Sequence, residues 1–233
     1  MGAGSRGVPV LQRHQGQCRG DPDGQRPRRR LTNVVPRLPG ATMLVTVGLM
    51  AAAGIAVGVA TRTGSGVLVI LDGVAAAPGF VARREIGLLP ASLPRQPYHV
   101  AAGLELEAAE ELVGQVERGA EEAAAAGLLA VAHSLSAGAA VLGVAVVVKA
   151  VSVPGRLAEV VRSHTWMHAA EGVLYREAVL AAARRCGWAA HALDLATLPA
   201  LDPQVADLGR SAGPPWRRIE KDAARAAILL LPS

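Results

Sequence analysis

Two histidines and a glutamate in the segment HTWMHAAEG, residues 164–172, have types and spacing that suit chemistry. His164, His168 and Glu171 stand at positions i, i+4 and i+7 of a stretch that reads as helix, so all three project from one helix face. Two imidazoles and a carboxylate on one face suit a divalent metal site, or a proton-transferring histidine that an acid orients. The spacing alone names no reaction.

The surroundings predicted for this cluster are apolar, because the same stripe continues with Leu157, Val161, Tyr175, Ala178 and Ala182. One interpretation is therefore a buried polar network with a structural role. The other is a functional site for acid–base or metal-assisted chemistry. Positions i to i+7 span about 10 Å of helix axis, so one ion bound by all three side chains would be strained. We expect a metal to bind His164 and His168 together with a distant residue.

Two further groups of residues are candidates for binding a ligand. Lys149 ends an apolar run, and a lysine at the end of a strand in an α/β domain can lie at the crevice where ligands bind. The alternative is a strand end that reaches solvent. Arg95, Tyr98 and His99 form a polar cluster in the long loop predicted over 75–100, and long loops often carry function. The alternative is a surface connection punctuated by proline.

The charge of the chain is concentrated at its N-terminal end. Residues 1–42 hold eight arginines and two aspartates, a net charge of +6 in a chain whose total is +5, so the remaining residues carry a net −1. A nucleic-acid-binding body therefore does not follow from the basic pI. Only six residues are aromatic, which argues against single-stranded nucleic-acid binding on stacking platforms. Cys18 and Cys186 cannot form a disulfide scaffold, and we expect a cytoplasmic protein.

The first 42 residues are rich in Gly, Pro, Arg and Gln and show no apolar period, so we expect a disordered basic tail. An alternative is that translation starts at Met43, where the composition changes. The uncharged stretch 43–61 is long enough for a membrane anchor, but Ala and Gly make up much of it. Together with the β-rich run 67–75, it favours two buried strands with a tight connection over a membrane-anchored protein.

The remaining pattern predicts alternating helices and strands. Extended structure is expected within 80–90, a helix over 104–135 with a break near Gly127, and a buried strand over 139–150. A long helix is expected from Pro154 to Cys186, a short strand over 189–198, a loop around Asp202, and a last helix over 216–231. The order β-β-β-α-β-α-β-α predicts a single α/β domain over 43–233 with the element order of the ribonuclease H-like fold.

Two short stretches resemble the Holliday-junction-resolvase branch of the ribonuclease H-like superfamily. Its members open with a pattern of the type VGxDxGxxxxGxAxS, and the stretch 47–61 matches it at Val47, Gly48, Gly58 and Ala60. Met50 stands at the place of the first metal-binding Asp. The segment 220–231 resembles the closing helix, in which Asp222 matches one acid and Arg225 replaces another; Lys149 stands where such enzymes often carry Glu.

The resemblance implies a ribonuclease H-like domain that has lost three of four carboxylate positions. Two-metal phosphoryl transfer needs several carboxylates, so the implied protein lacks nuclease activity and binds a ligand or partner in a cleft. Lys149, the helix cluster and Asp222 would line it. The rival is an enzyme whose general acid or base is His164 or His168, with Glu171 as the residue that orients it, acting either without a cofactor or with the help of a divalent metal. Nucleic acid, through the fold or the basic tail, and a second copy of the chain are the partners to consider.

Overall fold

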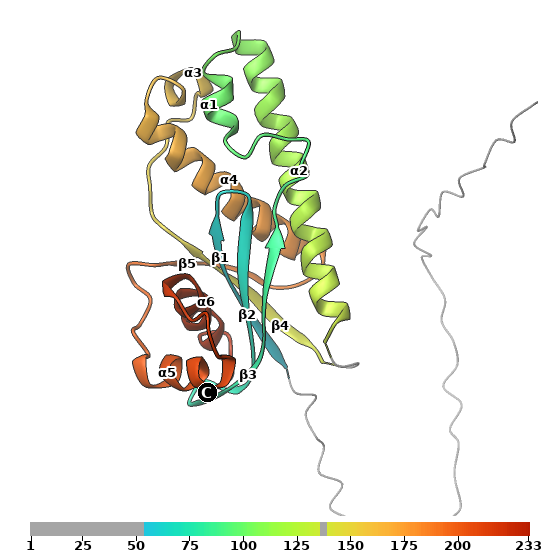
Figure 1. Cartoon of the computed structure of the whole chain (residues 1–233), viewed down its shortest axis with the longest axis vertical. Helices are drawn as coiled ribbons and strands as arrows, with labels where there is room; N and C mark the ends of the chain where they lie inside the picture. Colours follow the sequence, from blue (N-terminus) through green and yellow to red (C-terminus); the bar gives the residue numbers. More distant parts are fainter. Residues whose placement is uncertain (1–53, 136–138) are drawn as a thin grey trace, which may run out of the picture. The chain divides into compact units, whose positions relative to one another are not determined.

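Five strands form one mixed sheet in the computed structural model, which describes residues 54–135 and 139–233 (Figure 1). The strands β1 (Ile55–Arg62), β2 (Ser65–Val74) and β3 (Ala77–Gly87) pair antiparallel. The strands β4 (Val141–Val148) and β5 (Ala190–Asp194) continue the sheet parallel to β1, in the order β3-β2-β1-β4-β5. The predicted hairpin entry and the α/β alternation that follows it are confirmed.

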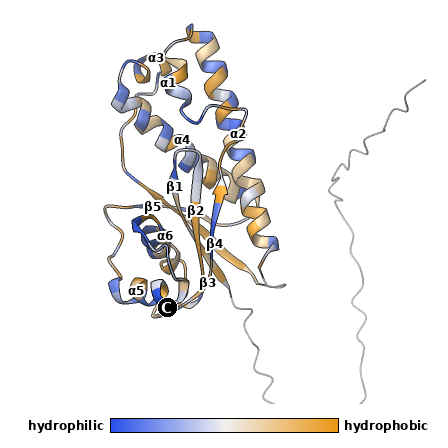
Figure 2. Cartoon of the chain, in the orientation of Figure 1, coloured by the Kyte–Doolittle hydropathy of each residue, from blue (hydrophilic) through white to orange (hydrophobic). Residues whose placement is uncertain are grey.

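Helices cover both faces of this sheet. The long helices α2 (Leu106–His133) and α4 (His164–Arg185) lie on one face, and α6 (Arg218–Ile228) and α5 (Asp202–Ala212) lie on the other. Two short helices, α1 (Pro97–Ala101) and α3 (Leu157–Val160), pack beside the N-terminal halves of α2 and α4. Figure 2 shows hydrophobic residues along much of the sheet, a hydrophilic stretch on β3, and both kinds of residue on the helices.

The central strand β1 separates two apolar cores because successive side chains of a strand point to opposite faces. Val57 and Val59 contribute to the core under α2 and α4, whereas Ala56 and Ala60 contribute to the core under α6. Gly58 lies directly beneath α6, where an added Cβ would stand 1.8 Å from the carbonyl oxygen of Ala223. The absence of a side chain at Gly58 therefore allows α6 to lie against the sheet.

Two helix predictions were wrong in detail. The long helix expected over 154–186 is divided into α3 and α4, because Ser163 starts a new helix by accepting a hydrogen bond from the backbone N–H of Trp166 at 3.4 Å. The break expected near Gly127 is absent, since α2 is continuous through it. Gly127 lies against Ile86, whose Cβ would be 3.0 Å from an added Cβ, so this glycine serves close packing on β3.

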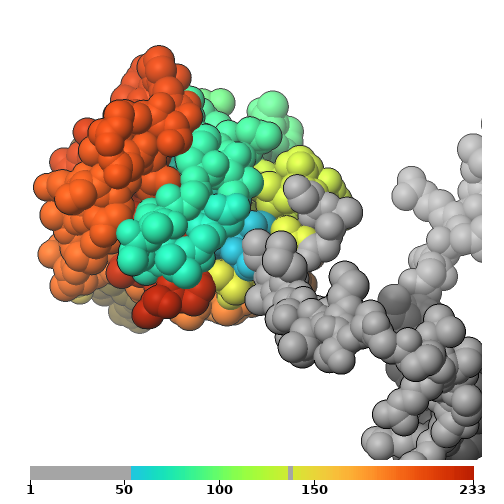
Figure 3. Space-filling model, turned by 90° about the horizontal axis from the view of Figure 1, so that it is seen from below, coloured from blue at the N-terminus to red at the C-terminus, as the bar shows by residue number. Residues whose placement is uncertain are grey.

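Two segments expected to be loops contain helices. The 75–100 segment holds all of β3 and most of α1, and the segment around Asp202 forms α5. Helix α5 packs against Trp216, which the sequence placed at the start of the last helix: its indole N–H donates to the carbonyl of Val205 at 3.1 Å. The chain ends beside the β2–β3 turn, where the N–H of Ala75 donates to the carbonyl of Pro232 at 2.8 Å (Figure 3).

Part of the stretch considered as a membrane anchor is the central strand, because residues 55–61 belong to β1. Among residues 54–135 and 139–233, no helix has the length and apolar character to cross a membrane. The predicted basic tail, the alternative start at Met43 and the position of Met50 lie outside the described residues.

Candidate functional site

Helix α4 carries the three residues of the predicted helix cluster, two of them at its start. His164 is the first residue of α4, directly after Ser163, and His168 follows one turn later. Glu171 lies a further turn along and is buried, with 2% of its side chain exposed, whereas His164 and His168 are exposed. The predicted apolar surroundings are therefore right for Glu171 and wrong for the two histidines.

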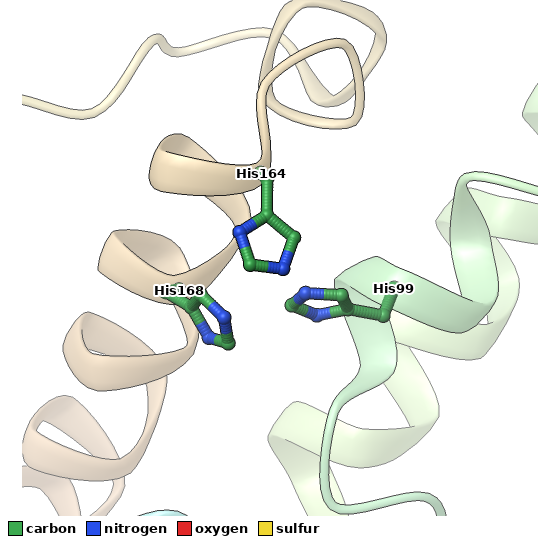
Figure 4. Close-up of side chains that lie close together, drawn as sticks. All are labelled: His99, His164 and His168. Atoms are coloured by element: carbon green, nitrogen blue, oxygen red, sulfur yellow. The ribbon is translucent and has the colours of Figure 1, made fainter.

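Helix α1 brings a third histidine to this place. Pro97, at the first position of α1, starts the helix, and the hydroxyl of Tyr175 on α4 donates to the carbonyl of Arg95 at 2.7 Å. This bond ties the segment before α1 to α4. His99 consequently extends from α1 toward the first turns of α4 (Figure 4).

The three imidazole rings face one another. Their centroids are 5.0 Å apart for His99 and His164, 4.6 Å for His99 and His168, and 4.4 Å for His164 and His168. One ring nitrogen from each histidine lies within 4.8 Å of the others, which is a spacing that could hold a metal ion. We call His99, His164 and His168 the histidine triad.

Glu171 connects the triad to the protein interior. Its Oε1 lies 2.8 Å from Nδ1 of His99, and its Oε2 lies 3.3 Å from Nδ1 of His168, the latter without hydrogen-bond geometry. A carboxylate beside Nδ1 favours the tautomer in which Nδ1 carries the proton. In this tautomer Nε2 has a free lone pair, which can accept a hydrogen bond or bind a metal ion. Nε2 of His99 is buried and has no hydrogen-bond partner in the described part of the chain.

Two tyrosines flank this carboxylate. Burial raises the pKa of Tyr98 to about 12, and the negative charges of Glu117 and Glu171 add to the effect. Burial also raises the pKa of Tyr175 to about 12, with a further contribution from Glu171 and an opposing one from Arg95. Both phenols therefore keep their protons at neutral pH. Tyr98 packs against apolar residues of α1, α2 and α4.

An open groove of about 560 Å³ borders the triad on the side of α1. Its walls include His99, the exposed Arg95 and Gln96, and Thr63 from the β1–β2 turn. The stem of Arg95 lies over Gly64 of that turn. The structure thus places two of the three loop candidates, Arg95 and His99, at the same groove.

Lys149 and Asp222 meet at a different place, the carboxyl end of the parallel strands. A cleft of about 280 Å³, here called the β1–β4 cleft, is lined by Ala60, Thr61, Val147, Val148, Lys149, Arg176, Leu195, Arg218, Ile219 and Asp222. Asp222 is the only acidic residue among these lining residues. The carboxylate accepts a hydrogen bond from Arg225 at 3.1 Å and lies 3.7 Å from Arg218. The residues of β1 that line the cleft are Ala60 and Thr61.

Three features of these sites were not predicted from the sequence. One is the contact of His99 with the pair on α4, although Pro97 marks a helix start two residues before His99. The other two are the positions of Arg176 and Arg218 in the lining of the cleft. Their positions depend on how α4 and α6 cross the sheet, for which the local sequence contains no signal.

No protein-family model and no curated protein sequence matches the chain. Among solved structures, the chain is similar to T. thermophilus RuvC in complex with a Holliday junction substrate, with 14% identity and a TM-score of 0.46 over 75% of this chain and 90% of that one. A second Thermus thermophilus RuvC structure has 17% identity and a TM-score of 0.41, over 75% and 91% of the two chains. RuvC is a Holliday junction resolvase, the branch of the ribonuclease H-like superfamily that residues 47–61 and 220–231 resemble. The observed strand order β3-β2-β1-β4-β5, with an antiparallel hairpin entry followed by α/β alternation, agrees with the element order predicted from the sequence.

Proposed function

We propose that this protein binds a divalent transition-metal ion through the histidine triad. The observation that carries the proposal is the environment of His99: its Nδ1 is next to Glu171, and its buried Nε2 has no hydrogen-bond partner among the described residues. Buried polar atoms are normally paired, so a purely structural network would be expected to satisfy this nitrogen. A metal ion between the three rings would satisfy it.

The ligand chemistry favours zinc or a similar ion. Imidazole nitrogens suit Zn²⁺, Cu²⁺ or Ni²⁺, whereas Mg²⁺ and Ca²⁺ prefer oxygen ligands. Nitrogens around one zinc ion lie about 3.3 Å apart, given Zn–N distances near 2.0–2.1 Å and tetrahedral geometry. The triad nitrogens lie within 4.8 Å of one another, and the exposed His164 and His168 have room to rotate inward.

Glu171 would act on the metal indirectly. A carboxylate that accepts the second N–H of a metal-binding histidine fixes the ring orientation and raises its basicity. Glu171 holds this relation to His99 from a buried position on α4. We therefore assign His99, His164 and His168 as ligands and Glu171 as the residue that positions His99.

The arrangement supports metal-assisted hydrolysis. Three protein ligands with a position open to water are typical of catalytic zinc sites, where the ion activates water. Nε2 of His99 is enclosed, so His99 is not placed to abstract a proton from a substrate, whereas a small ion between the rings could still reach this nitrogen. Metal-free acid–base catalysis would instead use the exposed His164 or His168. The groove with Arg95 and Gln96 would receive the substrate.

Metal content after purification without a histidine tag tests the proposal. We expect about one equivalent of zinc or cobalt per chain after desalting, and less than a tenth of that in His99→Ala and in His164→Ala/His168→Ala. His191→Ala is the matched control because His191 is exposed on β5, outside the triad. Cobalt-loaded protein should show visible d–d absorption that the triad variants lose. The proposal would be contradicted if wild type and His99→Ala retained the same amount of metal, or if wild type retained no metal.

We also propose that the domain does not cleave nucleic acid by a two-metal mechanism. In the β1–β4 cleft, Asp222 is the single carboxylate of the lining, and it pairs with Arg225. Two metal ions about 4 Å apart need more negative ligands than this. Incubation of a four-way DNA junction with the protein and Mg²⁺ or Mn²⁺ should give no cleavage. Cleavage that disappears in Asp222→Asn would overturn this second proposal.

A further inference from the structure

The β1–β4 cleft has the charge of an anion site. Lys149, Arg176 and Arg218 line it, against the single carboxylate of Asp222. That carboxylate is already engaged by Arg225, which lies outside the lining, and Arg218 approaches it at 3.7 Å. The cleft therefore has an excess of positive charge before any ligand is considered.

Two of these cations lack an acidic partner. Within residues 54–135 and 139–233, neither Lys149 nor Arg176 forms an ion pair. Arg176 is half-buried on α4, and its burial lowers the pKa of the guanidinium, with Glu177 as a weaker opposing influence. A partly desolvated cation without a partner costs free energy, which a bound anion would offset.

The backbone at the N-terminus of α6 adds to the positive potential in the cleft. Arg218 and Ile219 occupy the first turn of the 11-residue helix α6 and line the cleft. N–H groups of a first helical turn have no partner within the helix, and the helix dipole is positive at this end. The N–H of Arg217, by contrast, is occupied by Glu220 at 2.8 Å. Side chains from β4, α4 and α6 thus converge with this helix end on one volume of about 280 Å³.

We propose that the β1–β4 cleft binds a phosphoryl group directly, through Lys149, Arg176 and Arg218, without a bridging metal ion. Guanidinium groups bind phosphate oxygens in bidentate geometry, and lysine contributes a point charge. Thr61, at the end of β1, lies in the lining and supplies a hydroxyl. The cleft would hold one phosphoryl group and part of the molecule that carries this group. That molecule is either a mononucleotide or a nucleic-acid backbone.

Phosphate binding to chelator-treated protein tests this inference separately from the triad, because no metal is then present to bind phosphate. The probes are inorganic phosphate, a 5′-mononucleotide and a short duplex oligonucleotide, titrated calorimetrically at constant ionic strength. Wild type should bind at least one of them. Lys149→Ala and Arg176→Gln should each weaken that binding about tenfold or more, since hydrogen bonds to charged groups are worth about 1.5–3 kcal/mol. The probe that binds most tightly identifies the source of the phosphoryl group.

Arg184→Gln is the matched control, because Arg184 is exposed near the end of the same helix α4, outside the cleft. Its binding should equal that of wild type. Lys149 is exposed, so Lys149→Ala keeps the test valid even if Arg176→Gln proves unstable. Failure of wild type to bind all three probes, or binding that Lys149→Ala leaves unchanged, would overturn the inference. Neither result would bear on metal binding by the triad.

Discussion

His99 and Glu171 stand 72 positions apart in the sequence, yet Nδ1 of His99 lies 2.8 Å from Oε1 of Glu171. The contact joins a five-residue helix to the buried face of α4. In the proposed metal site, Glu171 would orient His99, because a carboxylate on Nδ1 favours the tautomer whose Nε2 can bind an ion. The short helix α1 is thus the element that brings His99 to α4.

Replacement of Glu171 by glutamine should weaken metal binding without removing a ligand. Glutamine keeps the shape of the side chain but removes the charge that supports His99. Loss of such a supporting carboxylate typically costs about 10–100-fold in metal affinity. Competition against a chromophoric chelator measures the change, and Glu177→Gln, exposed on the same helix, should leave the affinity unaltered. Equal affinities for Glu171→Gln and wild type would refute the positioning role.

Tyrosine ionisation should occur well above its ordinary range. The chain contains only Tyr98 and Tyr175, and the pKa of each is raised to about 12 from an ordinary value of 10, chiefly by burial. Because the folded state holds these protons more tightly than the unfolded state, the associated stability is complete below pH 10 and is lost as the pH rises to 12.

An absorbance titration of tyrosinate reads this directly, since no other tyrosine contributes. Tyr175→Phe leaves Tyr98 as the single titrating phenol and so assigns its midpoint. The free energy of unfolding should fall between pH 10 and 12. A midpoint near 10 in the folded protein would show that these side chains are not desolvated as the structure has them.

Substitution of Gly58 by alanine should destabilise the fold through α6. The added Cβ would meet the Ala223 carbonyl oxygen at 1.8 Å, so either β1 or α6 must move. Such overpacking costs about 1–3 kcal/mol and sometimes more. Gly155→Ala is the matched control, because nothing lies within 4 Å of its added Cβ. Urea denaturation of both variants compares them, and equal stabilities would contradict the close approach of α6.

The strands and the long helices could be predicted from the sequence because their signals are local. The run VLGVAVVV reads as β4 by composition alone, and the spacing of His164 and His168 needs only helix geometry. Helix α5 could not be predicted in the same way. Gly209 within it makes room for Trp216, whose ring would lie 2.6 Å from an added Cβ, and this contact exists only in the folded chain.

The histidine triad could likewise not be predicted from local sequence patterns. His99 was recognised as a candidate, but its neighbours are set by the packing of α1 on α4 and by the bond from Tyr175 to Arg95. No short-range sequence pattern indicates a contact between residues so far apart in the sequence. The cleft is a similar case, since Arg176 and Asp222 come from helices on opposite faces of the sheet.

The pair Asp222–Arg225 supplies a last prediction about the balance of charge at the β1–β4 cleft. Asp222 is buried, and Arg225 donates to it at 3.1 Å and to the carbonyl of Ala200 at 2.7 Å. Arg225→Met should therefore destabilise the protein by about 1–3 kcal/mol, because a buried carboxylate loses its main partner. Arg218→Met should cost less, since Arg218 is 84% exposed and lies farther away.

A second substitution separates the ion pair from the packing of the arginine stem. If the unpaired charge causes the loss, Asp222→Asn should restore part of the stability when combined with Arg225→Met, and the coupling in the double-mutant cycle should be favourable to the pair. Urea denaturation at neutral pH measures all four proteins. An additive result would mean that Arg225 stabilises α6 through Ala200 alone, which would leave the Asp222 charge free to oppose a phosphoryl group in the cleft.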